Sequence, residues 1–177
     1  MKAIVILSIL LMTGGVQTEW IDFNKASQLN HWVIVNDGVM GGLSQGAFSL
    51  NDSGNAVFYG QISLDNNGGF SSVRHRFAPM DMSSYKTIVM RLKGDGKRYQ
   101  LRVKSSQYDQ HSYISYFNTS GDWEIIEVSL SAMYASFRGR KLNMPDFNCQ
   151  EIAELSILIA NNKVESFRLE LDYIHLK

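Results

Sequence analysis

A glycine-rich run, VNDGVMGGLSQG at residues 35–46, is the stretch of this sequence whose residue types and spacing could do chemistry. Such a run can cradle a phosphate, form a catalytic turn or build a structural corner. Phosphate-binding loops follow G-x-x-x-x-G-K-[ST], where the lysine contacts the phosphates, and dinucleotide-binding loops follow G-x-G-x-x-G at the start of a helix. The run has no lysine and no helical pattern after it. The sequence therefore predicts no nucleotide cofactor here.

Catalytic side chains do not converge in the sequence. Residues 42–46, GLSQG, match the letters of the nucleophile elbow G-x-S-x-G of one large class of hydrolases, but the helical pattern that must follow such an elbow is missing. The single cysteine, Cys149, lies in MPDFNCQE without a neighbouring histidine or base, so we expect a small buried or half-buried residue. Carboxylates that could form a glycosidase pair fall mostly on alternating, solvent-facing strand positions. We therefore expect a protein that binds rather than catalyses.

Metal-binding spacing is also missing. The four histidines are isolated from one another, and no H-x-x-x-H, C-x-x-C or EF-hand pattern occurs. A calcium ion held by loop carbonyls and Asp65 or Asp122 is an open alternative, although aspartates at such positions are common turn formers. The spacing therefore predicts neither a metal nor another cofactor.

Composition and charge limit the class of protein. The chain has 177 residues, 45% of them hydrophobic and 19% charged, which is typical of one globular domain. Lysine plus arginine balances aspartate plus glutamate at 17 each, so the formal net charge is zero. Because nucleic-acid binding relies on a basic surface that neutralises phosphates, we expect no nucleic-acid partner.

The first residues are typical of an export signal. An apolar run at residues 3–12 follows a lysine and precedes small polar residues, as in a signal peptide. The run is shorter than the roughly 20 residues of a membrane-spanning helix, and no helical period follows it, as a nucleotide-binding fold with a buried first strand would require. We expect a signal peptide over residues 1–18, cleaved between Gly15 and Glu19, and one mature domain over 19–177 without a membrane span. The predicted location is periplasmic or secreted; without cleavage the chain would be cytoplasmic or membrane-associated.

After the signal-like segment the hydrophobic pattern has a period of two, which is typical of strands with one buried face. The clearest examples are RYQLRVK at 98–104 and SFRLELDY at 166–173, and IAELSILIA at 152–160 has the continuous apolar run of a central strand. Weaker patterns predict strands in NAVFYGQISL, FSSVRHRF, TIVMRLK, SYISYFN and WEIIEVS, and a further strand at Trp32 precedes the glycine-rich run. About nine or ten short strands separated by turns predict an all-β fold, a jelly-roll β-sandwich.

Two connections stand out from the turns between strands. Asp95-Gly96 predicts a hairpin between a strand ending near Lys93 and one starting near Arg98. The segment Ser129–Glu151 has no clear strand pattern and holds two arginines and a lysine in SFRGRKL. A loop of this length in a compact domain is often functional.

Aromatic residues offer an alternative function. The chain has eight Tyr, nine Phe and three Trp, most of which we expect to fill the core. Tyr108, Tyr113 and Tyr116, near a predicted loop, are the candidates for an exposed platform that stacks on sugar rings. The alternative function is therefore an extracytoplasmic carbohydrate-binding module.

Five blocks of sequence carry a resemblance when they are taken together and in order. The most specific is WVIVNDGVMGGLSQG at 32–46, with the core N-D-x-V-M-G-G-x-S, and it is supported by GGFSSVRHRF at 68–77 and SFRGRKL at 136–142. The other two are YKTIVMRLKGDGKRYQLRV and ELSILIANNKVESFRLELDYI. The chain after Trp20 thereby resembles, over nearly its whole length, the NADH:ubiquinone oxidoreductase complex I intermediate-associated protein 30 family.

The resemblance implies a fold and a function. The fold would be a galactose-binding-like jelly roll, in agreement with the strand pattern. The best-known members of that family are mitochondrial, chaperone-like factors that hold intermediates of respiratory complex I and have no established catalysis. The resemblance thus implies a non-enzymatic module that binds another protein in an assembly role. Mitochondrial members would carry an arginine-rich amphipathic transit peptide, whereas this chain begins with a signal-like segment.

The predicted binding surface combines the glycine-rich run with arginines from other blocks. It consists of Asn36, Asp37, Met40, Gly41, Gly42, Ser44, Arg74, Arg138, Arg140 and Lys141. We expect the glycines of the run to supply positive φ angles and close backbone approach, while Asn36 and Asp37 accept backbone N–H bonds. Asp37 is also predicted to pair with Arg74 or Arg138. A structural corner is favoured over a ligand site for this run.

Overall fold

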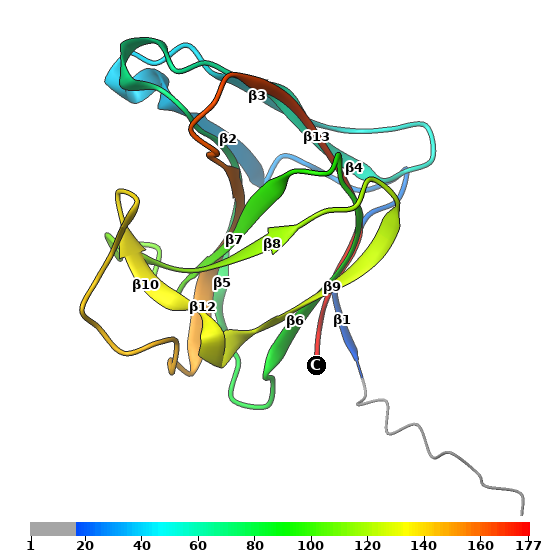
Figure 1. Ribbon diagram of the computed structural model, residues 1–177. Helices are drawn as coiled ribbons and strands as arrows, with labels where there is room; N and C mark the ends of the chain where they lie inside the picture. Colours follow the sequence, from blue (N-terminus) through cyan, green and yellow to red (C-terminus); the bar gives the residue numbers. More distant parts are fainter. Residues whose placement is uncertain (1–16) are drawn as a thin grey trace, which may run out of the picture.

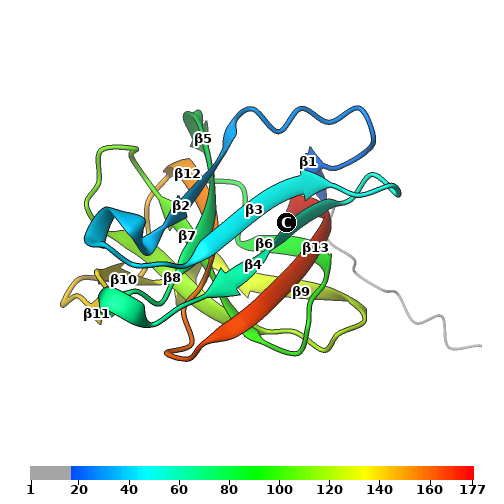
Figure 2. The ribbon, with the colours of Figure 1, turned by 90° about the horizontal axis from the view of Figure 1, so that it is seen from above.

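Two antiparallel sheets pack face to face in the computed structural model, which describes residues 17–177 (Figure 1). Residues 1–16, and with them most of the predicted signal peptide, lie outside the described residues. No helix within residues 17–177 is long and apolar enough to cross a bilayer. The chain enters through a short strand beside the C-terminal strand and then crosses between the sheets several times (Figures 1 and 2).

The six-stranded sheet is built around the last strand of the chain. Its spatial order is β3 (Gln45–Leu50), β4 (Ala56–Ile62), β13 (Glu165–Leu176), β6 (Thr87–Lys93) and β9 (Trp123–Ser129), and β1 (Thr18–Asp22) also pairs with β13. β4 pairs with the first half of β13, β1 with its end, and β6 with its second half. β13 therefore joins three strands that are far apart in the sequence.

The seven-stranded sheet carries most of the candidate site. Its spatial order is β11 (Arg140–Lys141), β10 (Tyr134–Phe137), β8 (Ser112–Asn118), β7 (Arg98–Lys104), β12 (Glu151–Ile159), β5 (Ser71–Asp81) and β2 (Trp32–Asn36). β12 is an interior strand, between β7 and β5, and is buried after its first residue, as its continuous apolar run predicted. Three short 3-10 turns complete the fold: η1 (Asp37–Met40), η2 (Asp65–Asn67) and η3 (Leu130–Ala132).

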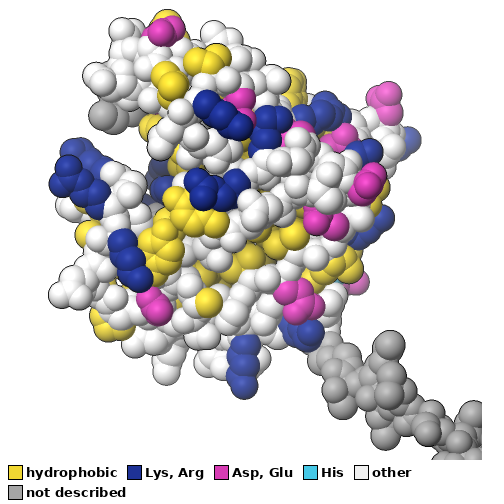
Figure 3. Space-filling model, viewed as in Figure 1, with side chains coloured by type: hydrophobic (Ala, Val, Ile, Leu, Met, Phe, Trp, Pro, Cys, Tyr) yellow, Lys and Arg dark blue, Asp and Glu magenta, His cyan; other side chains and the backbone are white. Residues whose placement is uncertain are grey.

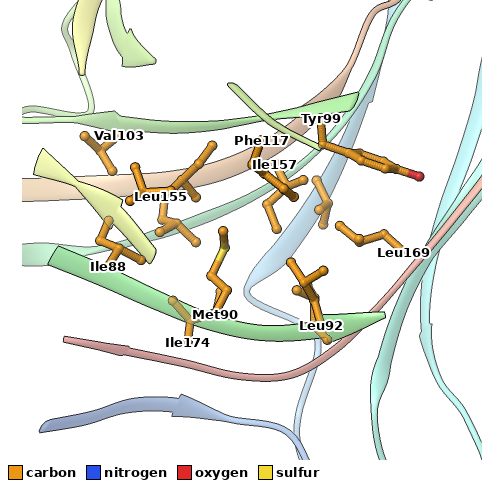
Figure 4. Close-up of a cluster of buried hydrophobic side chains, with 14 of the residues drawn as sticks. Ile88, Met90, Leu92, Tyr99, Val103, Phe117, Leu155, Ile157, Leu169 and Ile174 are labelled. Atoms are coloured by element: carbon orange, nitrogen blue, oxygen red, sulfur yellow. The ribbon is translucent and has the colours of Figure 1, made fainter. Parts of the chain in front are cut away.

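Alternating side chains of the two sheets fill the space between them. Leu155 and Ile157 of β12 face Ile88 and Met90 of β6 across this core, and all four are fully buried (Figure 4). Because side chains of a strand alternate between its two faces, the residues between these core positions point away from the core. The core of the seven-stranded sheet thus fixes which of its residues form the outer face.

The predicted jelly-roll sandwich is confirmed, and each strand expected from the period-two pattern is present. Four strands were missed, namely β1, β3, β10 and β11. They are short or carry glycine, serine or charged residues, so their alternation is weak. The prediction that Ser129–Glu151 has no strand is wrong, since β10 and β11 form a hairpin inside it.

The sequence correctly predicts a turn at Asp95-Gly96, but the predicted hairpin around this turn is wrong. Gly96 has a φ of +77°, as the dipeptide suggests. The strands on either side nevertheless belong to different sheets, because β6 pairs with β13 and β9 whereas β7 pairs with β12 and β8. The Asp95 carboxylate accepts hydrogen bonds from the Tyr99 hydroxyl at 3.0 Å and from the backbone N–H of Arg168 at 2.9 Å. The turn is therefore a crossover that ties the two sheets together.

Candidate functional site

The glycine-rich run folds into a corner at the end of β2, which we call the Asp37 corner (residues 36–44 and 63–70). The Asp37 side chain is only 1% exposed. Its Oδ1 accepts the backbone N–H of Ser44 at 3.0 Å, and its Oδ2 accepts the backbone N–H groups of Gly69 at 2.6 Å and Phe70 at 3.2 Å. One carboxylate thereby joins segments that are 32 residues apart in the chain.

The hydrogen bonds to Asp37 decide its charge. Burial alone would raise the pKa of Asp37, but the bonds donated by Ser44, Gly69 and Phe70 favour the ionised form and leave the pKa below its ordinary value. A Cβ at position 42 would overlap the Asp37 carboxyl group. Only glycine at this position therefore allows Asp37 to make these hydrogen bonds. The expected N–H acceptance by Asp37 and close approach at Gly42 are therefore confirmed.

Gly41, Asn36 and Ser44 of the predicted surface also serve the internal structure of the corner. Gly41 has a φ of +87°, as expected, and its carbonyl accepts a hydrogen bond from Asn66 Nδ2 at 2.9 Å. The prediction that Asn36 accepts backbone N–H groups is wrong, because its Oδ1 accepts the Ser71 hydroxyl at 2.7 Å and its side chain does not cap η1. The Ser44 hydroxyl accepts the backbone N–H of Ser63 at 3.0 Å. Met40 lies in η1.

The predicted ion pair of Asp37 with Arg74 or Arg138 is wrong. The Arg74 Nε donates to the Ser72 hydroxyl at 3.2 Å, and the Arg138 guanidinium lies 5.3 Å from the ring centre of Phe137. The physical reason is that backbone N–H groups already occupy both oxygens of the Asp37 carboxylate. Arg74 instead belongs to the outer face of the seven-stranded sheet.

A row of side chains crosses that outer face over six neighbouring strands. From β2 through β5, β12, β7 and β8 to β10, the register places in line Val33, Arg74, Ser156, Arg102, Ile114 and Tyr134. Side chains next to them in the sequence, such as Val73, Leu101 and Leu155, lie in the core. The row therefore points away from the core.

Further cationic and aromatic side chains border this row. We use the name arginine face for the outward positions Arg74, Arg76, Arg98, Arg102, Tyr116, Tyr134 and Glu154. Arg74 and Arg102 flank Ser156 on either side of β12, so their backbones are two strand spacings, roughly 10 Å, apart. Arg102 donates from Nε and Nη2 to the amide oxygen of Gln100, at 2.9 and 2.6 Å.

Glu154 is the carboxylate of the arginine face and is only 2% exposed. Its Oε2 accepts a hydrogen bond from Arg76 Nε at 2.8 Å. The ion pairs found among residues 17–177 include neither Arg74 nor Arg102. Burial lowers the pKa of both guanidinium groups, and the charge of Arg74 lowers that of Arg102 further. Both remain protonated at neutral pH, so the face holds cationic charge that no ion pair within the described chain balances.

Cations also cover the two tyrosines of the face. The Arg98 guanidinium lies 4.5 Å from the ring centre of Tyr116, and Lys141 Nζ lies 4.9 Å from that of Tyr134. Burial raises the pKa of Tyr134, and the neighbouring Tyr116 raises it further. One side of each ring is therefore occupied by a cation.

The structure brings the predicted surface residues to one side of the molecule without joining them. The Asp37 corner follows β2 at one edge of the seven-stranded sheet, and Arg138, Arg140 and Lys141 lie in the β10–β11 hairpin at the opposite edge. Figures 1 and 2 show both segments on the same side of the sandwich. Figure 3 shows a hollow on that side, bordered by Lys and Arg side chains. Of the predicted residues, Arg74 lies on the sheet face between the two segments.

Of the three candidate platform tyrosines, the structure excludes Tyr113 and separates the other two. Tyr113 is only 5% exposed and packs in the core, where it makes an edge contact with Phe147. Tyr108 is 95% exposed in the loop after β7, and Tyr116, which is 43% exposed, lies toward the far end of β8. Alternation along SYISYFN places Tyr113 and Tyr116 on opposite faces of that strand.

The most central residue of the arginine face, Arg102, was not predicted from the sequence. The signal was present, since Arg98, Gln100 and Arg102 occupy the polar positions of RYQLRVK. What the sequence did not reveal is that β12 inserts between β5 and β7 and so places Arg74 and Arg102 on the same row.

Three further candidates for a site within residues 17–177 are Cys149, a hollow beside it and clusters of metal-binding side chains. Cys149 is half-buried, as expected, and its thiol lies 3.9 Å from the Tyr113 hydroxyl. A shallow hollow of about 520 Å³ beside it is lined by side chains that include Met82, Tyr85 and Phe147. No group of three or more His, Cys, Asp or Glu that could hold a metal occurs within residues 17–177.

The fold defines the class of the protein as a jelly-roll β-sandwich of the galactose-binding-like type. In solved structures it is similar to the family 11 carbohydrate-binding module of the cellulosomal cellulase Lic26A-Cel5E of Clostridium thermocellum, with a TM-score of 0.65 and 15% identity over 91% of this chain and 94% of that one. The module from the same organism in complex with a β-1,3-1,4-mixed-linked tetrasaccharide gives a TM-score of 0.63 and 17% identity, over 92% of this chain and 96% of that one.

Sequence comparison then gives the family. The profile of the family described as Complex I intermediate-associated protein 30 matches residues 21–171. The chain belongs to this family. It is 24% identical over 194 residues to the mitochondrial Complex I intermediate-associated protein 30 of Drosophila melanogaster, covering 96% of this chain and 66% of the fly protein. The chain thus spans somewhat less than two thirds of that relative.

Proposed function

We propose that this protein is a non-enzymatic binding module that holds a protein partner on the arginine face, in an assembly or chaperone-like role. The observation that carries the proposal is the arginine face itself. It is a cationic surface on the outer side of a sheet, and the two sheets are the only layers of residues 17–177. Family membership supports the assembly role, because the family is described by its association with an intermediate of complex I.

The test is a pull-down with the tagged full chain as bait in an envelope extract of its source. The deciding variant is Ser156→Trp, which places a bulky ring between Arg74 and Arg102. The control is Ser166→Trp on the outer side of the other sheet, at an exposed position of β13, whereas Ser156 is only 3% exposed. We expect the native chain and the control to enrich the same partner and Ser156→Trp to lose it.

The controls of this pull-down separate binding from folding. Thermal unfolding checks that Ser156→Trp is folded, and the double variant Arg138→Ala, Arg140→Ala tests the same side of the molecule at exposed hairpin positions. Undiminished enrichment by a folded Ser156→Trp chain contradicts the proposal. The identity of the partner tells whether respiratory assembly is involved.

A second candidate function is carbohydrate binding outside the cytoplasm. The observation that favours it is Tyr116, an exposed aromatic ring on the arginine face. Native gel electrophoresis in mixed-linked β-glucan is the test: retardation of the native chain that disappears in Tyr116→Ala supports this function. Equal mobility with and without the polysaccharide contradicts it for this sugar.

We also propose that the protein acts after export. The support is the signal-like pattern of the first residues, which lie outside the described part of the chain. Fractionation of the source cells tests this proposal. Recovery of the protein outside the cytoplasm supports it, and recovery of the uncleaved chain in the cytoplasm contradicts it.

A further inference from the structure

The arginine face has a local charge that the whole molecule does not have. The chain is neutral overall, with 17 cationic and 17 acidic residues. On the face, Arg74, Arg76, Arg98 and Arg102 share one carboxylate, Glu154, which is hydrogen-bonded to Arg76. Because the protein has no net charge, this local positive charge acts on a ligand in contact with the face and does not attract long polyanions from a distance.

Hydrogen bonds to uncharged partners fix the guanidinium groups of Arg74 and Arg102 in place, and no carboxylate within residues 17–177 forms an ion pair with either. Arg102 has two N–H groups fixed on the neutral amide oxygen of Gln100, and Arg74 has its Nε–H fixed on the Ser72 hydroxyl. Neither partner is charged. Arginine presents its remaining N–H donors in a planar fork that matches the two oxygens of a carboxylate.

The aromatic rings of the face are less available to a sugar than their number suggests. Arg98 covers one side of Tyr116, and Lys141 covers one side of Tyr134. Stacking on a pyranose needs an open ring face. The covered rings instead bring two more cations to the border of the same surface.

Apolar side chains alternate with the cationic ones along the central row. Val33 precedes Arg74, whereas Ile114, which lies between Arg102 and Tyr134, is only 2% exposed and leaves no surface for a ligand. Val33 is 55% exposed, so apolar contact area is available there. A ligand that fits this row carries both negative and apolar groups, which is a property of polypeptides and not of a uniformly charged polysaccharide or nucleic acid.

We propose that the arginine face recognises an acidic segment of its protein partner, in which Asp or Glu side chains pair with Arg74 and Arg102 and a neighbouring apolar side chain contacts Val33. The inference rests on the proposed function and specifies the chemistry of the partner. Glu154 stays paired with Arg76 and repels acidic segments placed over it. The segment is therefore centred on Ser156, between the two free arginines.

The experiment measures direct binding of synthetic peptides to the full chain by fluorescence anisotropy. The probes are a twelve-residue peptide of alternating Glu and Val with solubilising ends, its Gln–Val counterpart and an oligogalacturonate as a non-peptide polyanion. The protein variants are the double change Arg74→Gln, Arg102→Gln and the control Arg168→Gln, an exposed arginine of β13 on the other sheet.

We expect saturable binding of the Glu–Val peptide, at least about tenfold weaker binding of the Gln–Val peptide, and a similar loss in the double variant but not in Arg168→Gln. Equal binding of the two peptides, or undiminished binding by the double variant, overturns the inference. Oligogalacturonate binding without Glu–Val binding also overturns it, in favour of an acidic polysaccharide.

The same variants keep this inference separate from the proposed function. In the pull-down, loss of the partner by Ser156→Trp together with loss by Arg74→Gln, Arg102→Gln supports both. Loss by Ser156→Trp with full capture by the double glutamine variant leaves the proposed function standing and overturns the acidic segment. Full capture by both folded variants overturns both.

Discussion

The Asp37 carboxylate is predicted to be the most sensitive single group of the corner. Asp37→Asn replaces one oxygen by an amide NH2, which cannot accept the N–H groups that now reach Oδ1 or Oδ2. Because a buried donor without a partner and a lost charged bond each destabilise, we expect the free energy of unfolding at pH 7 to fall by about 2 kcal/mol. Urea unfolding measures it, with Asp52→Asn in an exposed turn as the control.

The same carboxylate makes a pH prediction. The folded pKa of Asp37 is lower than in the unfolded chain, so its contribution to stability is complete above the unfolded pKa of about 4 and is lost as the pH falls through the folded pKa. We expect the difference in unfolding free energy between the native chain and Asp37→Asn to shrink below about pH 4. A difference that stays constant from pH 7 down to the lowest pH at which the chain folds would contradict this role.

Substitution of Arg74 and Arg102, unlike Asp37→Asn, is predicted not to lower the stability of the fold. Both guanidinium groups are partly desolvated, lack an ion pair within residues 17–177, and are close enough for the charge of Arg74 to affect Arg102. We expect Arg74→Gln, Arg102→Gln to unfold at the same urea concentration as the native chain or at a higher one, since a desolvated charge costs folding free energy. A clear loss of stability would mean that the two arginines hold the sheet together.

At the scale of single residues the sequence was informative about Asp37 and uninformative about its partners. Aspartate followed by glycines predicts a side chain that accepts backbone N–H groups, and this was correct. The donors Gly69 and Phe70 are distant in the sequence, so no local pattern could identify them. Arg102 was missed for the same reason, because its proximity to Arg74 depends on the strand between them.

Among the elements, the β3–β4 hairpin depends on a glycine in the middle of a strand. Gly60 pairs with Gly46, and a Cβ at position 60 would overlap the backbone carbonyl of Gln45. We expect Gly60→Ala to destabilise the chain by about 2–3 kcal/mol through this overlap and to speed hydrogen exchange of the β3 amides in particular.

The control for Gly60→Ala is Gly96→Ala, in the turn that connects β6 and β7. Gly96 has a φ of +77° and open space around its Cβ position, so Gly96→Ala carries only the cost of the left-handed backbone, about 1 kcal/mol. We expect no selective increase in the exchange of β3 amides in that variant. Equal effects of the two substitutions on β3 would contradict the role of Gly60 in the register.

The elements also show where prediction from the sequence ends. Period-two alternation located the long strands because each buries one face, and this was enough to give the fold class. The sequence does not reveal strand order: β7 and β8 are neighbours in the sequence and pair, but β12 and β13 insert between strands that precede them in the sequence. Tertiary packing alone decides those positions, and with them the composition of the arginine face.

For the whole molecule, an acidic segment held by arginines implies a salt effect. Salt screens charge pairs that are partly exposed, and the net charge of zero gives no long-range attraction to compensate. We expect capture of the partner by the native chain to weaken at least about tenfold between 0.05 and 0.5 M NaCl, whereas residual capture by Arg74→Gln, Arg102→Gln changes little. Salt-independent capture by the native chain would point to apolar contacts.

The mature N-terminus can be predicted more narrowly with the structure than with the sequence. Cleavage was expected between Gly15 and Glu19, and β1 begins at Thr18, which pairs with Leu176. A cut after Thr18 would shorten a strand of the six-stranded sheet, so we expect the first residue of the exported protein to be Val16, Gln17 or Thr18. Intact mass measurement of the protein from its source decides this, and an uncleaved chain would contradict it.

The position of β13 has a consequence for how the protein is made. Residues 165–176 leave the ribosome after β1, β4 and β6, and each of these three strands lacks one neighbour until β13 arrives. The nascent chain therefore stays without its finished six-stranded sheet until β13 has emerged, so closure of the sandwich is a late step of folding. If the polypeptide is threaded through a membrane, this delay keeps it in the extended state that a translocation channel accepts.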